Sequence, residues 1–215
     1  FRVRPGRSRD SGAASGRRSQ KLAAQVQRAA NKAGHAGSRR AGLKRGSGSG
    51  KAARGRRTVA AMRRTPGQRR VTIMARIARH NGAQYRAAPL AKHITYLERD
   101  GVSRDGRDAS MFDAQTDRAD RDAFAGRCED DRHHFRFIVS PEDAGDMEDL
   151  RSFTRELMAD AAKDLGTELD WVAVDHWNTD NPHIHVLVRG VASDGTDLVI
   201  DRGYISEGLR FRAVE

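Results

Sequence analysis

The charged residues of this 215-residue chain are divided unevenly between its two ends. Residues 1–70 contain 21 of the 40 Lys and Arg residues and a single acidic residue, Asp10, whereas the rest of the chain contains 19 basic and 28 acidic residues. The basic part is rich in Gly, Ser and Ala and has no aromatic residue after Phe1. Such a segment cannot bury enough apolar surface to offset its chain entropy. We therefore expect a disordered leader over residues 1–68 and a folded domain over residues 69–215.

The composition excludes several classes of protein. One cysteine, Cys128, excludes an internal disulfide and a zinc site built from several cysteines. No apolar run approaches the roughly 20 residues of a membrane-spanning helix, so we expect no insertion into a membrane. The basic leader predicts contacts with the phosphate backbone of a nucleic acid. The expected contacts include Arg56, Arg57, Arg63, Arg64, Arg69 and Arg70.

Hydrophobic periodicity predicts an α+β fold. Apolar residues alternate with polar ones, or form short β-branched runs, over residues 71–77, 133–140, 169–176, 183–189 and 198–201, which are the five expected strands. Helical spacing predicts helices over 89–99 and 141–165, the first ended by Gly101 and the second capped by Ser140 and ended by Gly166. Residues 103–131 are expected to form a loop. Because a turn at 193–195 would place two hairpins in succession, we expect a largely antiparallel five-stranded sheet flanked by helices.

Three of the eight histidines lie within ten residues of one another, at His176, His183 and His185. His183 and His185 are two residues apart on an expected strand, so their side chains share one face of the sheet. The intervening and following apolar residues then point into the core. If His176 lies opposite either of them across the hairpin, the three imidazoles converge. Three neutral imidazoles can hold one divalent metal ion and leave positions open for water or a phosphate oxygen.

Three further residues are candidates for the same site. Asp175 and Asp180 flank the histidine motif and are candidates to orient a ligand imidazole, although either can equally be a turn residue. Tyr96 lies on the helix expected over 89–99, away from its apolar stripe and beside His93 and Asp100. A half-exposed helix tyrosine without a catalytic role has the same pattern. The assignment of Tyr96 as a catalytic residue is therefore supported only together with the neighbouring motifs.

Two of these motifs together resemble those of the HUH endonucleases, and among them the conjugative relaxases, or mobilization nucleases. Residues 176–186 resemble the metal-binding motif of the family, and residues 93–101 resemble the motif that carries its catalytic tyrosine. Residues 133–143 resemble a strand–helix segment of one plasmid-borne relaxase group. The likeness covers about residues 70–215. Because relaxases are much longer, we expect this chain to be the nuclease portion of a longer protein, truncated at its C-terminus.

The resemblance implies that the domain nicks one DNA strand at a plasmid origin of transfer. Tyr96 would attack the scissile phosphate and form a 5′-phosphotyrosyl linkage, assisted by one Mg²⁺ or Mn²⁺ ion on His176, His183 and His185. His133 would be a base or polar neighbour, or a histidine at the edge of the core. The implied setting is the bacterial cytoplasm, with translocation alongside the DNA. The implied partners are single-stranded DNA, accessory relaxosome proteins and the coupling protein of a type IV secretion system.

Two other functions compete with this one. A nucleotide hydrolase of the histidine-triad kind also places alternating histidines on a strand, but it needs a third one where this chain has Leu187. The composition alone also fits a non-catalytic nucleic-acid-binding protein, in which the leader supplies affinity and the histidines are incidental. Cleavage of single-stranded DNA distinguishes these alternatives.

Overall fold

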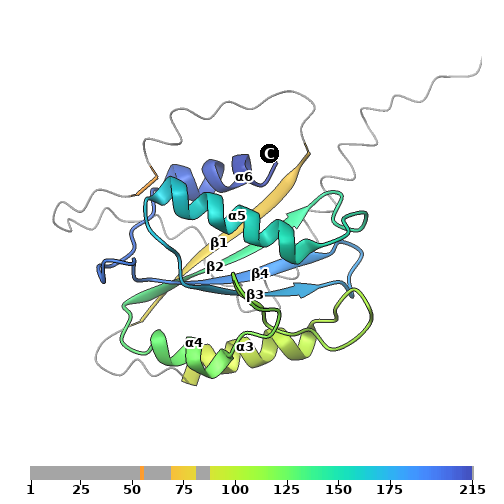
Figure 1. Ribbon diagram of the computed structural model, residues 1–215, viewed down its shortest axis with the longest axis horizontal. Coiled ribbons are helices and arrows are strands. Elements are labelled where there is room, and N and C mark those ends of the chain that lie inside the picture. Colours follow the sequence, from red (N-terminus) through yellow and green to blue (C-terminus); the bar gives the residue numbers. More distant parts are fainter. Residues whose placement is uncertain (1–53, 56–68, 81–87, 215) are drawn as a thin grey trace, which may run out of the picture.

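The domain is built on an antiparallel sheet of four strands in the order β1-β2-β4-β3. The computed structural model describes residues 54–55, 69–80 and 88–214. Helices α3 and α4 cover one face of the sheet, and α5 and α6 cover the other (Figure 1). The elements are β1 (Val71–Arg79), α3 (Ala88–Asp100), α4 (Arg121–Arg127), β2 (His133–Pro141), α5 (Leu150–Leu165), β3 (Trp171–His176), β4 (His183–Arg189), η2 (Tyr204–Gly208) and α6 (Leu209–Arg212).

The observed sheet confirms the expected α+β class and four of the five expected strands. Alternation along the strands divides the apolar side chains between two cores. The larger core lies beneath α5 and α6 and includes Phe135, Phe137, Ile184 and Val186. The smaller one joins α3 and α4 to the opposite face of β3 and β4. Of the expected disordered leader, residues 1–53 and 56–68, with Arg56, Arg57, Arg63 and Arg64, lie outside the described residues.

The fifth strand, expected over residues 198–201, is absent from the described part of the sheet. The chain does turn at residues 193–195, where Gly195 has a positive φ of 77°, but a single bridge, between Val191 and Asp197, joins the two arms of this turn. The reason is the strand order: β4 is central, and β2 and β3 already occupy both of its edges. The segment therefore leaves the sheet, and Leu198 is buried in the larger core without strand geometry.

One expected helix boundary, the start at Pro141 with Ser140 as the cap, was also wrong. The helix expected from Pro141 begins at Leu150, because β2 continues to Pro141, which pairs with Val71. Its cap is Asp149, whose carboxylate accepts hydrogen bonds from the backbone N–H groups of Arg151 and Ser152. Its end at Gly166, in the left-handed conformation at φ 61°, is as expected.

The loop expected over residues 103–131 contains a short helix, α4. It is only seven residues long, so its apolar side chains are too few to produce a recognisable period. Phe124 and Ala125 are nevertheless buried, and Asp120 caps the helix through the backbone N–H groups of Asp122 and Ala123.

Arg54, from the expected leader, is bound to the domain. Its backbone forms a parallel bridge with Ile200. Its guanidinium donates hydrogen bonds to the carbonyl oxygens of Leu165 (3.3 Å) and Gly166 (3.1 Å), at the C-terminus of α5, and to the Asp194 carboxylate (3.1 Å). A cation at this end satisfies carbonyl groups that have no partner within the helix and interacts favourably with the helix dipole.

We expect Arg54→Ala to lower the free energy of unfolding of the full chain by about 1 kcal/mol, because two hydrogen bonds at the end of α5 and one to Asp194 are lost. Urea unfolding followed by circular dichroism measures the change. Arg107→Ala is the control, because Arg107 is also paired with an aspartate but its side chain is 83% exposed. Equal stability of the two variants would show that the Arg54 contacts contribute nothing to the domain.

Candidate metal centre

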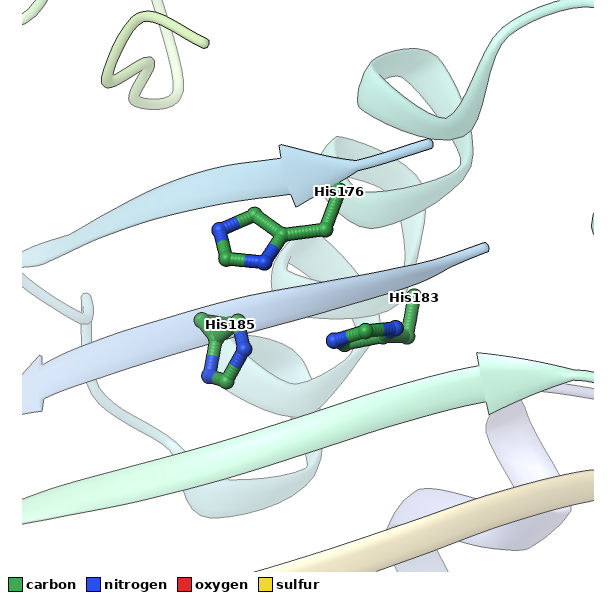
Figure 2. Close-up of side chains that lie close together, drawn as sticks. All are labelled: His176, His183 and His185. Atoms are coloured by element: carbon green, nitrogen blue, oxygen red, sulfur yellow. The ribbon is translucent and has the colours of Figure 1, made fainter. Parts of the chain in front are cut away.

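Three histidine side chains converge on the face of the sheet that α3 covers. His176 at the end of β3 is paired directly with His183 at the start of β4, and His185 follows two residues later on the same face. Their ring centroids lie 4.6–5.3 Å apart, and Figure 2 shows the three rings grouped over the two strands. The structure thus confirms the convergence predicted from the motif, through the pairing of His176 with His183.

The hydrogen bonds of two of these imidazoles fix which nitrogen is available to a ligand. His176 lies with Nε2 2.9 Å from the carbonyl oxygen of Leu97, and His183 lies with Nδ1 3.1 Å from that of Asn181. Because a carbonyl only accepts, each of these nitrogens is the N–H donor, and the lone pair of a neutral ring is on the other nitrogen. Such a backbone acceptor behind the ring is typical of metal-ligating histidines.

The three histidines fit a metal ion by position and burial. One nitrogen from each lies within 4.8 Å of the others. The side chains are 3–6% exposed. Among the described residues, the Nε2 atom of His183 is buried without a hydrogen-bond partner, which is costly for a polar atom unless a ligand binds it. His176, His183 and His185 could therefore hold one divalent cation.

Burial keeps two of these imidazoles, His176 and His183, neutral. It lowers the pKa of His176 to about 4, helped by the neighbouring His183, and it also lowers the pKa of His183. A neutral imidazole retains the lone pair that coordinates a metal, whereas a protonated one does not. These two rings are thus available for coordination at pH 7.

The C-terminus of α3 is attached directly to this centre. Besides the bond from His176 to Leu97, the Asn178 amide donates to the carbonyl oxygen of Asp100 at 2.9 Å. Gly101 follows the helix, and a Cβ atom there would lie 2.7 Å from the His176 ring. Only glycine permits this close approach, because real Cβ atoms do not come so near to another heavy atom.

Tyr96 lies on the last turns of α3, one residue before the carbonyl that binds His176. Its hydroxyl is hydrogen-bonded to the Asp100 carboxylate, one helical turn further on. Burial and this hydrogen bond raise the pKa of Tyr96 to about 12, although the Arg99 guanidinium over its ring opposes the shift. The phenol is therefore protonated at pH 7, and its hydrogen-bond partner is a carboxylate.

The other predicted site residues are not brought to the imidazoles. Asp175 points to the opposite face, where it accepts hydrogen bonds from Arg151 (3.0 Å) and Trp177 (2.8 Å). His133 also lies on that face, near the far end of β2, with Nε2 2.9 Å from the Leu198 carbonyl oxygen. Asp180 is exposed in the loop between β3 and β4. The roles of Asp175, His133 and Asp180 at the site remain predictions.

Asp100 is a site residue that the motif analysis did not assign. The signal was in the sequence, since Tyr96 and Asp100 are four residues apart on an expected helix and so occupy neighbouring positions on its surface. The backbone acceptors at Leu97 and Asn181 had no such signal, because any residue type provides a carbonyl.

Comparison with known families agrees with this geometry. The family described as Relaxase: MobA/VirD2-like, nuclease domain, matches residues 92–208, which include Tyr96 and all three histidines. The match spans more than half of the chain, and the chain belongs to this family of relaxase, or mobilization, nucleases. No match was found among curated proteins or solved structures. Membership of the family implies a DNA substrate.

Among the residues that the structure describes, no helix is both long enough and apolar enough to cross a bilayer.

We expect the metal-free protein to lose stability as the pH falls from 6.5 to 4. The pKa of His176 is about 4 in the folded state and 6.5 for an unperturbed histidine, so in this window the unfolded state binds more protons. His176 alone contributes a loss on the order of 1 kcal/mol per pH unit. Urea unfolding in the presence of a chelator measures it. His176→Asn should flatten the dependence, and a wild-type curve that is already flat would contradict the neutral, buried imidazole.

Proposed function

We propose that this domain nicks one strand of DNA at a plasmid origin of transfer by transesterification, with Tyr96 as the nucleophile. The observation that carries the proposal is the attachment of the Tyr96 helix to the three-histidine cluster through the Leu97 carbonyl and His176. The helix that carries the nucleophile is thereby joined by a hydrogen bond to the strand that carries one of the three histidines. The burial of all three histidines and the neutral state of His176 and His183 support the same conclusion.

The residues of the chain account for the movement of the proton. The Tyr96 oxygen forms a bond to phosphorus while the bond from phosphorus to the 3′ oxygen breaks, and the phenol proton passes to the Asp100 carboxylate. The 3′ oxygen leaves with the bonding electrons and takes a proton from solvent. Because the pKa of Tyr96 is about 12, the tyrosine needs this acceptor to react near pH 7. The product is a 5′-phosphotyrosyl linkage that retains the energy needed for rejoining.

His176, His183 and His185 are the residues that would hold the metal ion. Bound there, a divalent cation supplies electrophilic stabilisation of the charge on a non-bridging phosphate oxygen. Of the two ions considered, Mg²⁺ and Mn²⁺, we propose Mn²⁺, because three imidazoles without a carboxylate suit a transition metal better than Mg²⁺.

The proposed partners follow from this reaction. They are single-stranded DNA at the origin of transfer, accessory relaxosome proteins and the coupling protein of a type IV secretion system, in the bacterial cytoplasm and during translocation with the DNA. The leader residues proposed to contact DNA are the arginines predicted from the sequence. Two of them, Arg69 and Arg70, are exposed directly before β1, and Arg69 forms an ion pair with Asp143 at 3.1 Å.

We expect Tyr96→Phe to abolish a covalent protein–DNA adduct that resists SDS, because the attacking oxygen is removed. The wild-type protein is incubated with single-stranded origin DNA and Mn²⁺, and the adduct is detected by its reduced mobility in a denaturing gel. Tyr204→Phe is the control: Tyr204 is a buried tyrosine of the opposite core, hydrogen-bonded to Asp164. An adduct that persists in Tyr96→Phe excludes Tyr96 as the nucleophile, and a wild-type protein that binds DNA without an adduct favours the non-catalytic alternative.

We expect His185→Ala to lower the affinity for Mn²⁺ by at least roughly tenfold, since one of three ligands is lost. Nicking should fall with it, whereas salt-sensitive binding of DNA should remain. Isothermal titration with MnCl₂ measures the affinity. The matched control is His133→Ala, which removes a histidine from the opposite face. Unchanged affinity in His185→Ala, or an equal loss in both variants, would refute the assigned centre.

A further inference from the structure

Trp177 follows directly after the last residue of β3 and is held by four contacts. Its backbone N–H donates to the carbonyl oxygen of Val102 at 2.8 Å. The Arg104 guanidinium lies over its indole ring, 5.3 Å from a ring centroid, and the side chain packs against the larger core. Its Nε1 atom donates to the Asp175 carboxylate at 2.8 Å. The indole is thus fixed on the face of the sheet opposite to the three histidines.

Asp175, which accepts from this indole, is itself bound to α5. Its other carboxylate oxygen lies 2.9 and 3.0 Å from two nitrogen atoms of Arg151, in the first turn of that helix. Arg151 also donates to the carbonyl oxygen and the hydroxyl of Ser110, at 3.3 and 3.2 Å. Only 17% of the Arg151 side chain and 6% of the Asp175 side chain are exposed, so the loss of either would leave a buried charge unpaired. The carboxylate therefore cannot move independently of α5.

His176 lies between Asp175 and Trp177 in the chain, and its ring projects from the other face of β3 (Figure 2). It is the last residue of a strand at the edge of the sheet, where the bridge between Phe112 and Ala173 is the nearest contact on the outer side among the described residues. The hydrogen bond between Asp175 and Trp177 closes a loop around the backbone of His176. A change in φ or ψ of His176 that turned its imidazole away would separate the indole from the carboxylate.

The direction of the His176 ring matters because its two nitrogens have different roles. Nε2 donates to the Leu97 carbonyl oxygen at 2.9 Å, so the lone pair of the neutral ring is on Nδ1. The rings of His183 and His185 lie with their centroids 5.3 and 4.6 Å from that of His176. A ring that rotated on a loose backbone would lose the bond to Leu97 and would no longer present Nδ1 in one direction.

We propose that Trp177, through its hydrogen bond to Asp175, is a positioning residue that holds the imidazole of His176 in its coordinating orientation from the opposite face of the sheet. Neither Trp177 nor Asp175 touches the metal ion or the DNA, and both act through the backbone of His176. That the oriented ring coordinates a metal ion rests on the proposed function. The orientation itself rests on the contacts of Asp175 and Trp177.

The first test measures the tautomer of His176 in the metal-free full chain near pH 7. Long-range proton–nitrogen NMR correlations distinguish the two ring nitrogens, and the His176 signals are those missing from His176→Gln. The wild type should show a proton on Nε2 and a lone pair on Nδ1. In Trp177→Phe, which keeps an aromatic ring but loses the N–H donor, we expect the two nitrogen shifts to converge, because the ring then exchanges between tautomers.

The matched control is Trp171→Phe. Trp171 is the first residue of the same strand, and its side chain is buried in the larger core. This substitution also replaces an indole by a phenyl ring in β3, but it leaves the bond between Asp175 and Trp177 in place. The His176 shifts should therefore remain those of the wild type.

The second test uses Co²⁺, whose visible absorption changes on coordination, as a probe of the metal centre. We expect Trp177→Phe to bind Co²⁺ roughly tenfold more weakly than the wild type, since residues that orient a ligand affect metal affinity by about this factor or more. Trp171→Phe should keep the affinity of the wild type.

Three outcomes overturn the proposal: wild-type His176 shifts in Trp177→Phe, unchanged Co²⁺ affinity in that variant, or equal effects in Trp171→Phe, which would indicate a general loosening of β3. The NMR measurement uses neither metal nor DNA. Converging shifts in Trp177→Phe, together with a wild-type protein that binds no Co²⁺, would therefore refute the metal centre and keep the orienting role of Trp177. Nicking by the wild type with unchanged shifts in Trp177→Phe would do the reverse.

Discussion

The pairing of β3 with β4 is the interaction on which the candidate site depends. His176 lies opposite His183 only in the observed register, and a slip of one residue in β4 would turn His183 and His185 toward α5. The residues that prevent such a slip are on the other side of the strand, where Ile184, Val186 and Val188 are buried in the larger core. Packing on the apolar face therefore determines the geometry of the polar one.

The second constraint is the contact between the end of α3 and β3. The Leu97 carbonyl accepts from His176 while it also accepts from the Gly101 N–H at 3.1 Å, and Gly101 leaves the space that the ring occupies. Rotation of the helix would break a hydrogen bond to a buried imidazole, which has no water to replace it. The hydrogen bond between the Leu97 carbonyl and His176 therefore fixes the position of Tyr96, the preceding residue of α3, relative to the histidines.

Sequence patterns predicted those parts of the molecule that depend on local periodicity. The period of two identified the four strands and placed His183 and His185 on one face, and the period of 3.6 identified α3. The errors arose where distant contacts decide. Residues 198–201 have strand composition but no free edge of β4 to join, and Asp175 is adjacent to His176 in sequence yet on the opposite face. The acceptor at Leu97 could not be predicted, because a backbone carbonyl leaves no mark in the sequence.

Strand alternation also separates the charges around the site in a way that suits an anionic substrate. Asp175 is next to His176 in the chain, but it lies behind the sheet, where the Arg151 guanidinium is 2.9 Å away and neutralises it. Burial keeps His176 and His183 in front uncharged, so they neither repel a metal ion nor attract a carboxylate to themselves. Asp100, a carboxylate on the α3 side of the sheet, is the hydrogen-bond partner of Tyr96. A sheet that put Asp175 in front would oppose the approach of a phosphate to the same three rings.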